Sequence, residues 1–178
     1  MAETIKQTEG APAAYPDAPE GLSTAAAALD PEMVWQRLES YVAHRWSERS
    51  IEWIVEGCGE WRPPLAPATI TTIEVWRADA WEALTVPPSP VGGYIMPGGT
   101  YRFTGTVGVD DSDVPAAVLE AWKRLAEYMA QKAGKAGARS ERVSAGSVSL
   151  SHTRSPSWMA EAMANSGAGD LLRNFRRA

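Results

Sequence analysis

The clearest periodic pattern in the chain lies between residues 113 and 132, where apolar side chains recur every three or four positions: Val118, Ala121, Trp122, Leu125 and Met129. This spacing forms one wide apolar stripe on an α-helix. Asp113 supplies an N-cap, and Pro115 fits the first turn, where its missing N–H costs nothing. Lys132 and Gly134 supply stop signals. We therefore predict a helix from Asp113 to about Lys132.

A second helix is predicted from Asp30 to about Ser47. Asp30, Pro31 and Glu32 form a typical start, with a cap, a proline at the first position and an acid in the first turn. Six apolar or aromatic residues then fall on one face: Val34, Trp35, Leu38, Tyr41, Val42 and Trp46. We expect this face to pack against the stripe of the first helix.

Between the two helices the pattern changes to strands and turns. Residues 51–56 read as a strand, and the prolines of residues 61–67 favour an extended chain. Two hairpins follow, one pairing residues 69–76 with 81–86 and one pairing residues 93–96 with 101–107 through Pro97-Gly98-Gly99. The fold class is therefore α+β: a small helical core of two main helices with inserted β-hairpins and extended arms.

The two ends of the chain differ in composition from this core. Residues 1–29 are rich in Ala, Pro, Glu and Gly and predict a flexible N-terminal arm, ahead of a core domain at 30–134. Residues 135–178 form a basic C-terminal arm, with an extended stretch at 144–157 and short helices after it. The last amphipathic turn, at 171–177, is too short to be stable alone. Its apolar side chains need a surface on this subunit's own core or on another chain.

Charge divides the chain in the same way. The 178 residues have a net charge of −5, but residues 1–122 carry 7 Lys/Arg against 18 Asp/Glu, and residues 123–178 carry 10 against 4. A basic tail on an acidic body fits nucleic acid, an acidic protein partner or simple solvation. Because the chain has one cysteine, Cys58, and no apolar run of membrane-spanning length, we expect a soluble protein made in the cytoplasm.

Motifs for chemistry are weak. His44 and Glu48 lie four apart on the predicted helix, but a metal site needs further ligands, so a surface histidine is the better interpretation. The acidic run at 110–113 lacks the glycine and the final glutamate of a calcium loop, and Gly92-Gly93 is not followed by a phosphate-loop Lys-Ser/Thr. We predict no catalytic residues, no metal, no cofactor and no enzymatic activity.

The tryptophans are the other candidate for function. Trp53, Trp61, Trp76 and Trp81 could stack on single-stranded nucleic acid. The same region is acidic, which argues against a phosphate backbone lying across it. We therefore assign a core or subunit-interface role to eight residues: Trp35, Trp46, Trp61, Trp76, Trp81, Trp122, Leu125 and Met129.

The order of the parts carries a resemblance. A helix leads to Trp61-Arg62-Pro63-Pro64-Leu65-Ala66-Pro67, then to the hairpin Ile73-Glu74-Val75-Trp76-Arg77-Ala78-Asp79-Ala80-Trp81. The segment 101–108, the helix from Asp113 and a tail ending Leu171-Leu172-Arg173-Asn174-Phe175-Arg176 follow. Over about residues 31–178 the chain resembles the head–tail connector (adaptor) family of tailed bacteriophages and gene transfer agents.

The resemblance implies a structural virion protein at the head–tail junction, assembled in the host cytoplasm. It implies a homo-oligomeric ring, usually a dodecamer, beneath the portal protein, with a tail-side or stopper protein below and DNA passing through without sequence-specific binding. It also implies a C-terminal arm that docks on the portal, for which the candidates are Val148, Leu150, Arg154, Trp158, Met159, Leu171, Leu172, Arg173, Phe175, Arg176 and Arg177.

Two expectations about the tail follow. Deleting residues 155–178 should leave the core folded and abolish portal docking. The alternative function is a nucleic-acid-binding accessory protein acting through the basic tail from Lys123 to Arg177, with an affinity that falls steeply with salt.

Overall fold

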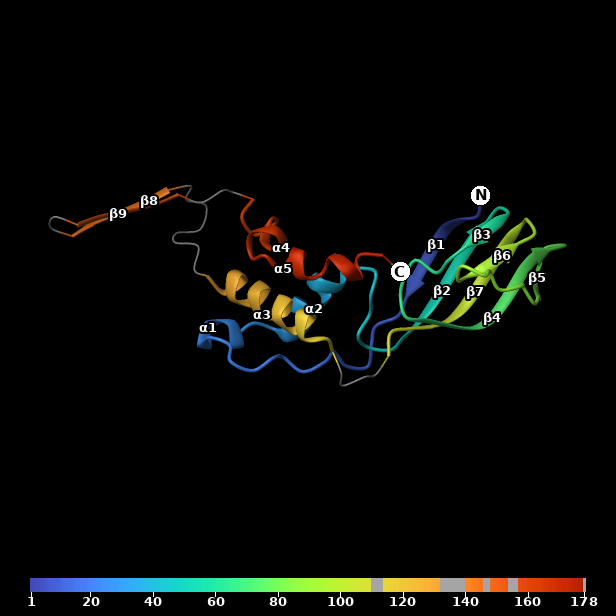
Figure 1. Cartoon of the computed structure of the whole chain (residues 1–178), viewed down its shortest axis with the longest axis horizontal. Helices are drawn as coiled ribbons and strands as arrows, with labels where there is room; N and C mark the ends of the chain where they lie inside the picture. Colours follow the sequence, from blue (N-terminus) through green and yellow to red (C-terminus); the bar gives the residue numbers. More distant parts are fainter. Residues whose placement is uncertain (110–113, 132–139, 146–147, 154–156, 178) are drawn as a thin grey trace. The chain divides into compact units, whose positions relative to one another are not determined.

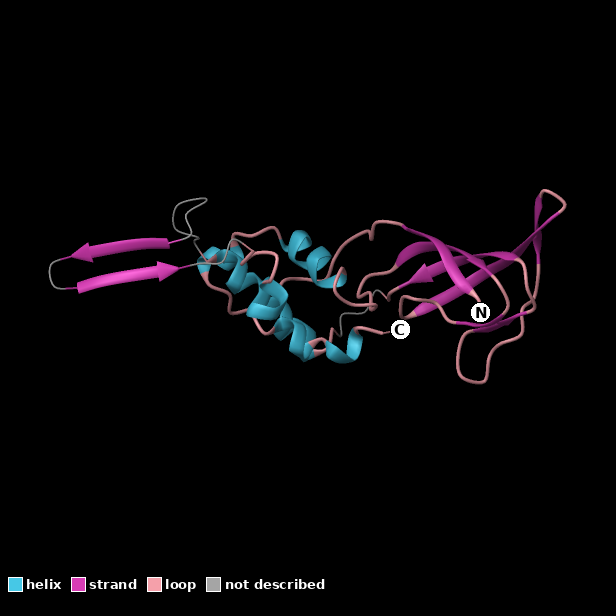
Figure 2. Cartoon of the chain, turned by 90° about the horizontal axis from the view of Figure 1, so that it is seen from above, coloured by secondary structure: helices cyan, strands magenta, loops and turns pink. Residues whose placement is uncertain are grey.

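The structure is a computed structural model that describes residues 1–109, 114–131, 140–145, 148–153 and 157–177. The chain divides into two compact units. Unit 1 combines Met1–Pro16, Val42–Val114 and Phe175–Ala178, and unit 2 combines Asp17–Tyr41 with Pro115–Asn174. The helices belong to unit 2, and unit 1 is built from strands (Figures 1 and 2). The predicted α+β class is confirmed.

Unit 1 is organised by a five-stranded antiparallel sheet (Figure 1). Its strands, in spatial order, are β1 (Glu3–Glu9), β2 (Arg49–Glu56), β7 (Thr100–Val107), β4 (Ala68–Arg77) and β5 (Ala80–Ala83). A separate two-stranded sheet pairs β3 (Gly59–Trp61) with β6 (Tyr94–Met96). The predicted strand at 51–56 is confirmed as β2.

The core of unit 1 lies on one face of the large sheet. Along β7 every second residue is buried, beginning at Tyr101, and Trp53 and Val55 of β2 lie directly opposite Phe103 and Tyr101. Trp61 of the small sheet packs on Phe103, with ring centroids 4.4 Å apart. Burying large aromatic side chains against each other gives this face most of its stabilisation.

Strand β1 departs from the prediction of a flexible N-terminal arm. Its side chains are mostly exposed, so the sequence offers no apolar alternation to detect. Two of its polar side chains nevertheless accept hydrogen bonds from core tryptophans. Gln7 accepts one from the indole N–H of Trp53 at 2.8 Å, and Thr4 accepts one from the indole N–H of Trp61 at 2.9 Å. A buried indole N–H without a partner is costly, so β1 is held by polar complementarity to the core.

The first predicted hairpin is confirmed and the second is wrong. Strands β4 and β5 pair with Trp76 opposite Trp81. Strand β6, however, pairs with β3, while β7 pairs with β2 and β4. Pro97-Gly98-Gly99 therefore connects two sheets instead of turning one hairpin. The sequence predicts the strands themselves. It does not indicate which strand a three-residue strand such as β6 will pair with, even when a glycine turn follows it.

The β4–β5 turn gives a stability prediction. Ala78 and Asp79 have φ values of 45° and 62°, as a two-residue type I′ turn requires. Alanine adopts this left-handed region poorly, and Asn-Gly is the preferred pair. The double variant Ala78→Asn/Asp79→Gly should raise the free energy of unfolding by about 0.5–1 kcal/mol. Urea unfolding followed by circular dichroism checks this, and a loss of stability would contradict it.

Unit 2 is built around α3 (Ala116–Ala130). The elements that pack against α3 are α1 (Thr24–Ala27), α2 (Pro31–Glu39), α4 (Ala162–Asn165) and α5 (Ala168–Leu171). The unit also contains the hairpin of β8 (Ser140–Ala145) and β9 (Val148–Thr153), and a short 3₁₀ helix, η1, spans Arg173–Phe175. None of the helices in the described ranges is long and apolar enough to cross a membrane.

The strongest predicted helix is confirmed as α3. Val118, Ala121, Trp122 and Leu125 are buried, and the ring centroids of Trp35 and Trp122 lie 6.3 Å apart, so the predicted contact with the second helix exists. Met129 is half-buried. Pro115 stands one position earlier than predicted, at the N-cap, and the predicted cap Asp113 lies outside the described residues.

The second helix begins as predicted but ends much earlier. Asp30 caps α2 by accepting a hydrogen bond from the Glu32 N–H at 3.0 Å. The helix ends at Glu39, not near Ser47. The next residues instead pair through the backbone with Ala66, whose N–H donates to Ala43 and whose carbonyl accepts from Arg45, both at 2.9 Å. His44 and Glu48 therefore do not share a helical face, and His44 is half-buried.

The C-terminal region follows the prediction in part. Strands β8 and β9 overlap the extended stretch predicted at 144–157. Ala162, Met163, Ala168 and Leu172 are buried in the core. Deleting residues 155–178 would remove these buried side chains, so we expect the truncation to destabilise unit 2 as well as to affect docking.

Candidate interaction surfaces

The described residues contain no cluster of three or more His, Cys, Asp or Glu side chains that could hold a metal ion. Cys58 is exposed. The acidic run at 110–113 lies outside the described ranges. Four features of unit 1 are candidates for interaction or for holding the unit together: a buried charge cluster, the aromatic surface that Phe175 contacts, an exposed aromatic pair and an apolar groove.

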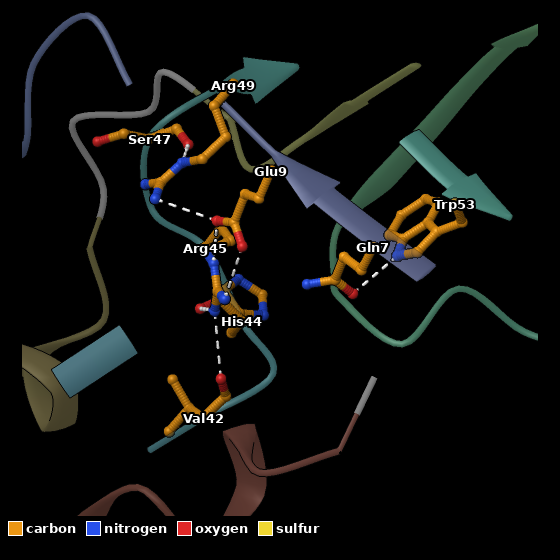
Figure 3. Close-up of polar contacts among 8 residues, drawn as sticks. All are labelled: Gln7, Glu9, Val42, His44, Arg45, Ser47, Arg49 and Trp53. Atoms are coloured by element: carbon orange, nitrogen blue, oxygen red, sulfur yellow. Dashed lines mark hydrogen bonds and ion pairs between the residues drawn. The ribbon is translucent and has the colours of Figure 1, made fainter. Parts of the chain in front are cut away.

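The charge cluster joins β1 to the segment that enters β2 (Figure 3). Arg45 holds the Glu9 carboxylate with two nitrogens, Nε at 2.6 Å from Oε1 and Nη2 at 3.1 Å from Oε2. Arg49 adds a third contact at 3.3 Å to Oε1. Both arginines are buried, whereas the Glu9 side chain keeps 21% of its surface exposed. One carboxylate thus compensates two desolvated guanidinium groups, which fixes the end of β1.

Both arginines also donate to main-chain oxygens. Arg45 donates to the carbonyls of Val42 and His44, each at 3.2 Å, and Arg49 donates to the carbonyl of Ser47 at 3.2 Å (Figure 3). The guanidinium of Arg49 also lies over the ring of Tyr15, 5.4 Å from its centroid. The segment between α2 and β2 is neither helix nor strand, and these contacts hold it in place.

The C-terminal segment contacts the same part of unit 1 through Phe175. The surface that Phe175 contacts, formed by His44 and Trp46, is its seat. The ring of Phe175 contacts His44 and Trp46, with centroid distances of 5.5 and 5.8 Å and edge-on geometry. The N–H of Ala43 donates to the carbonyl of Phe175 at 2.9 Å. Edge-to-face aromatic contacts of this kind add to the burial energy of the rings. Within this chain, Phe175 therefore already occupies an apolar surface.

His44 makes this seat sensitive to pH. Burial, and then the positive charge of Arg45, hold the pKa of His44 below its usual value of 6.5. The folded state therefore binds this proton less readily than the unfolded state. His44 costs no stability above about pH 6.5, and stability falls as the pH drops from 6.5 through the folded pKa. His44→Gln should flatten the dependence of the unfolding midpoint between pH 7.5 and 5.5; an unchanged dependence would contradict this.

An exposed aromatic pair lies on the β4–β5 hairpin. Trp76 is 45% exposed, and its ring centroid lies 5.1 Å from that of Trp81. The guanidinium of Arg102 lies 4.6 Å from the centroid of Trp81 and pairs with Glu74 at 2.6 Å. Glu74 and Arg102 thus support the pair from the neighbouring positions of the sheet. A partly exposed indole on a fixed hairpin is a typical anchor for a protein partner.

An apolar groove of about 400 Å³ lies at the other end of β4. It is lined by Arg62, Pro63, Leu65, Ala66, Ala68, Ile70, Pro88, Val91, Gly92, Gly93 and Tyr94. Gly93 is required here, because its φ is +81° and a Cβ would lie 2.2 Å from the carbonyl oxygen of Trp61. The residue lets the loop pass close to β3 and so shapes the wall of the groove.

Unit 2 is tied together by polar contacts on its surface. The N–H and hydroxyl of Ser23 donate to the Glu127 carboxylate at 2.6 and 2.8 Å, while the same hydroxyl caps α1 at Ala26. These bonds lower the pKa of Glu127. Arg37 donates to the carbonyl of Met159, and the rings of Tyr128 and Trp158 lie 5.7 Å apart. The contacts hold α1 and the segment before α4 against the helices of the unit.

The residues predicted to dock on a partner are dispersed. Leu172 is fully buried, Phe175 sits in its seat on unit 1, and Leu171, Trp158 and Met159 are half-buried. Arg173, Arg176 and Arg177 are exposed, while Arg154 lies outside the described residues. Val148 and Leu150 fall within β9.

Most of the predicted interface residues are core residues. Trp35, Trp46, Trp61, Trp122 and Leu125 are buried. Trp76 and Trp81 remain accessible. The structure adds Glu9, Arg45 and Arg49, which sequence reasoning missed because nothing in the sequence indicates which carboxylate reaches which arginine.

Comparisons with known proteins bear on the fold. No protein-family model and no curated protein matches the chain. Among solved structures, a chain of the neck of an empty GTA particle, computed with C6 symmetry, is 15% identical with a TM-score of 0.50, covering 91% of this chain and 95% of that one. A chain of the neck of a native GTA particle, computed with C12 symmetry, is also 15% identical, with a TM-score of 0.40 and 82% of both chains covered.

A chain of the virion of a native gene transfer agent (GTA) particle is likewise 15% identical, with a TM-score of 0.42, covering 100% of this chain and 96% of that one. The first of the three matches reaches a TM-score of 0.50 and spans nearly all of both chains, so the fold assignment rests on it. The resemblance expected from the order of the parts is thereby confirmed at the level of the fold: the chain has the fold of a protein from the neck of a GTA particle.

Proposed function

We propose that this chain is a structural, non-enzymatic protein of a virion neck, a head–tail connector that forms a ring beneath the portal and provides a channel for DNA. The observation that carries the proposal is the fold match over nearly the whole chain to a neck protein solved with C6 symmetry. The match covers almost all of both compared chains, so the shared fold includes the sheet and the helices.

The surfaces of unit 1 support a role in assembly. An exposed tryptophan pair and an apolar groove are features that a subunit presents to a protein neighbour. A ring requires two different patches on each subunit, because every copy contacts one neighbour on each side. Acidic residues outnumber basic ones in residues 1–122, which suits a channel through which DNA slides without binding.

Portal docking is proposed for the part of the C-terminal region that stays accessible in the folded chain. Arg173, Arg176 and Arg177 are exposed there, and Trp158 and Met159 are half-buried. Leu172 takes part in docking only if its segment leaves the core, since it is fully buried. We propose that the tail-side or stopper partner binds the opposite end of the ring.

The proposal is tested with the purified full chain, alone and mixed with the portal protein of the same virus or agent. Electron microscopy should show a closed ring that stacks coaxially on the portal. Arg173→Glu/Arg177→Glu should weaken stacking, and Lys6→Glu, an exposed charge change on β1, should not. A protein that stays monomeric and ignores the portal would refute the function. Tight, steeply salt-dependent DNA binding without a ring would instead favour the nucleic-acid-binding alternative.

A further inference from the structure

Strands β8 and β9 form a two-stranded sheet with no third strand among the described residues (Figures 1 and 2). Each strand has six residues, and their pairing runs from Ser140 opposite Thr153 to Ala145 opposite Val148 without a shift in register. In the part of the chain that the structure describes, the main contacts of each strand are with the other strand. A two-stranded hairpin is marginally stable at best alone in water, so we expect a further partner.

The β8–β9 hairpin has two chemically different faces. Residues that pair across an antiparallel sheet share a face, and successive residues along a strand alternate between faces. A sheet with this alternation can form the wall of a barrel, whose inner and outer sides differ in the same way. One face takes Val143, Ala145, Val148 and Leu150, with Glu141 and His152 at its end, and the other takes Ser140, Arg142, Ser144, Ser149, Ser151 and Thr153.

The edges of the hairpin lack the features that protect the edges of the large sheet. Edge strands present unpaired N–H and C=O groups, and lysine, proline, bulges or a short length commonly keep them from pairing. Strand β1 carries Lys6 and a shift in register beside it, and β5 has only four residues. The stretch from Val143 to Leu150, by contrast, has no charged residue and no proline. Both edges of the hairpin are therefore suited to pair with further strands.

A second copy of this chain is the partner that covers both edges at once. When hairpins lie side by side around a rotation axis, β9 of one copy runs antiparallel to β8 of the next. Each contact then uses the β9 edge of one copy and the β8 edge of its neighbour, and closing the ring leaves no edge open. A strand from a different protein would cover one edge of each hairpin and leave the other edge open.

The size of such a barrel agrees with a channel for DNA. A ring of about 12 copies would give roughly 24 strands, and with strands ~4.8 Å apart and tilted by ~40° the barrel would be ~48 Å across between backbones. A ring of about six copies would be ~24 Å across by the same estimate. Side chains on the inner side would make the smaller barrel too narrow for a duplex, so the larger ring is the one that fits.

From these observations we propose that β9 of each subunit pairs with β8 of the next copy, so that the β8–β9 hairpins form one closed β-barrel. The inference rests on the proposed function, because a ring is what brings the hairpins together around one axis. It assigns Val148 and Leu150 to the contact between copies and leaves portal docking to the residues that follow Ser157.

Hydrogen exchange of the full chain tests the pairing directly. The chain is compared as a monomer, below its assembly concentration, and as a ring verified by electron microscopy. Amides of the β8–β9 peptide should exchange tenfold more slowly or less in the ring, because the open edges become hydrogen-bonded. A ring without this protection, or protection that appears only when portal protein is added, would overturn the pairing while leaving the ring standing. A chain that forms no ring, alone or with portal protein, would refute the proposed function and the pairing with it.

A lysine placed on the edge gives the second test. Ser151→Lys introduces into β9 the residue that commonly protects an edge, and it should raise the concentration needed for half-assembly by tenfold or more. Thr8→Lys is the matched control, because it makes the same kind of change at an exposed position of β1, another edge strand. Sedimentation velocity measures assembly, and circular dichroism checks that both variants are folded. Equal assembly of the two variants would contradict the barrel.

Discussion

Replacing Trp122 by alanine should cost unit 2 about 3–5 kcal/mol of stability, the usual loss for a large aromatic side chain removed from a well-packed core. Trp122 is 1% exposed and lies at the centre of the buried face of α3, in contact with Trp35 of α2. Because α1, α2, α4 and α5 all pack on α3, the cavity would weaken every helix of the unit. The loss is a large part of a typical domain stability of about 5–15 kcal/mol.

Hydrogen exchange measured by peptide gives the test, since it separates the two units. Peptides from α2, α3 and α5 should lose protection in Trp122→Ala, and peptides from β2 and β7 should keep theirs. Trp122→Phe is the matched control and should cost much less. Its ring keeps most of the packing, and no described residue accepts a hydrogen bond from the indole N–H that it removes. Equal losses in both variants would contradict the packing argument.

Replacing Glu9 by alanine should destabilise unit 1 by about 2–3 kcal/mol. The change leaves two buried guanidinium groups, those of Arg45 and Arg49, without their shared carboxylate. Removing one partner of a fully buried ion pair typically costs about 3–5 kcal/mol, and the partial exposure of Glu9 reduces the expected loss to just below that range. Glu9→Gln should recover only part of the loss, because an amide does not compensate two positive charges.

The matched control is Glu3→Ala, which removes a carboxylate from the other end of the same strand. Glu3 is exposed, so its replacement should change stability by less than about 0.5 kcal/mol. Urea unfolding of the three variants, with hydrogen exchange of the β1 peptide, measures the difference. Similar effects of Glu3→Ala and Glu9→Ala would show that the arginine cluster does not hold β1.

The elements that could be predicted from the sequence are those whose signals are local. Helix α3 carries five apolar positions at helical spacing, and the β4–β5 hairpin begins with a β-branched strand that leads into a short turn. The start of α2 could be predicted from three consecutive residues, Asp30, Pro31 and Glu32. In each case the local conformational preference of the residues agrees with the element that they form in the folded unit.

The elements that were missed depend on contacts between residues far apart in the sequence. Strand β1 is polar along its length and becomes a strand because Trp53 and Trp61 need acceptors, 46 and 57 residues away. The helix predicted over residues 30–47 stops at Glu39 because Ala66 competes for the backbone of the next segment. Phe175 joins unit 1 through His44 and Trp46, which no local pattern indicates.

The same contrast between local signals and contacts of distant residues applies to the candidate surfaces. Sequence reasoning identified Trp76 and Trp81 as interface candidates, and both remain accessible in the folded chain. The apolar groove was missed, because it forms only when the loops at 62–70 and 88–94 come together. Leu172 was expected to face a partner and is buried, since a single apolar residue in a short helix gives no sign of which surface will cover it.

The interleaved order of the two units has a consequence for synthesis. All five strands of the large sheet have left the ribosome once Val107 has emerged, but the helices of residues 24–39 must wait for α3. At about 5–20 residues per second, roughly 5–20 s separate Leu38 from the end of α3. During that interval Val34, Trp35 and Leu38 have no core to enter, and the nascent chain offers a short apolar segment to chaperones or to aggregation. Translation speed between residues 40 and 130 is thus a variable on which the yield of folded protein depends.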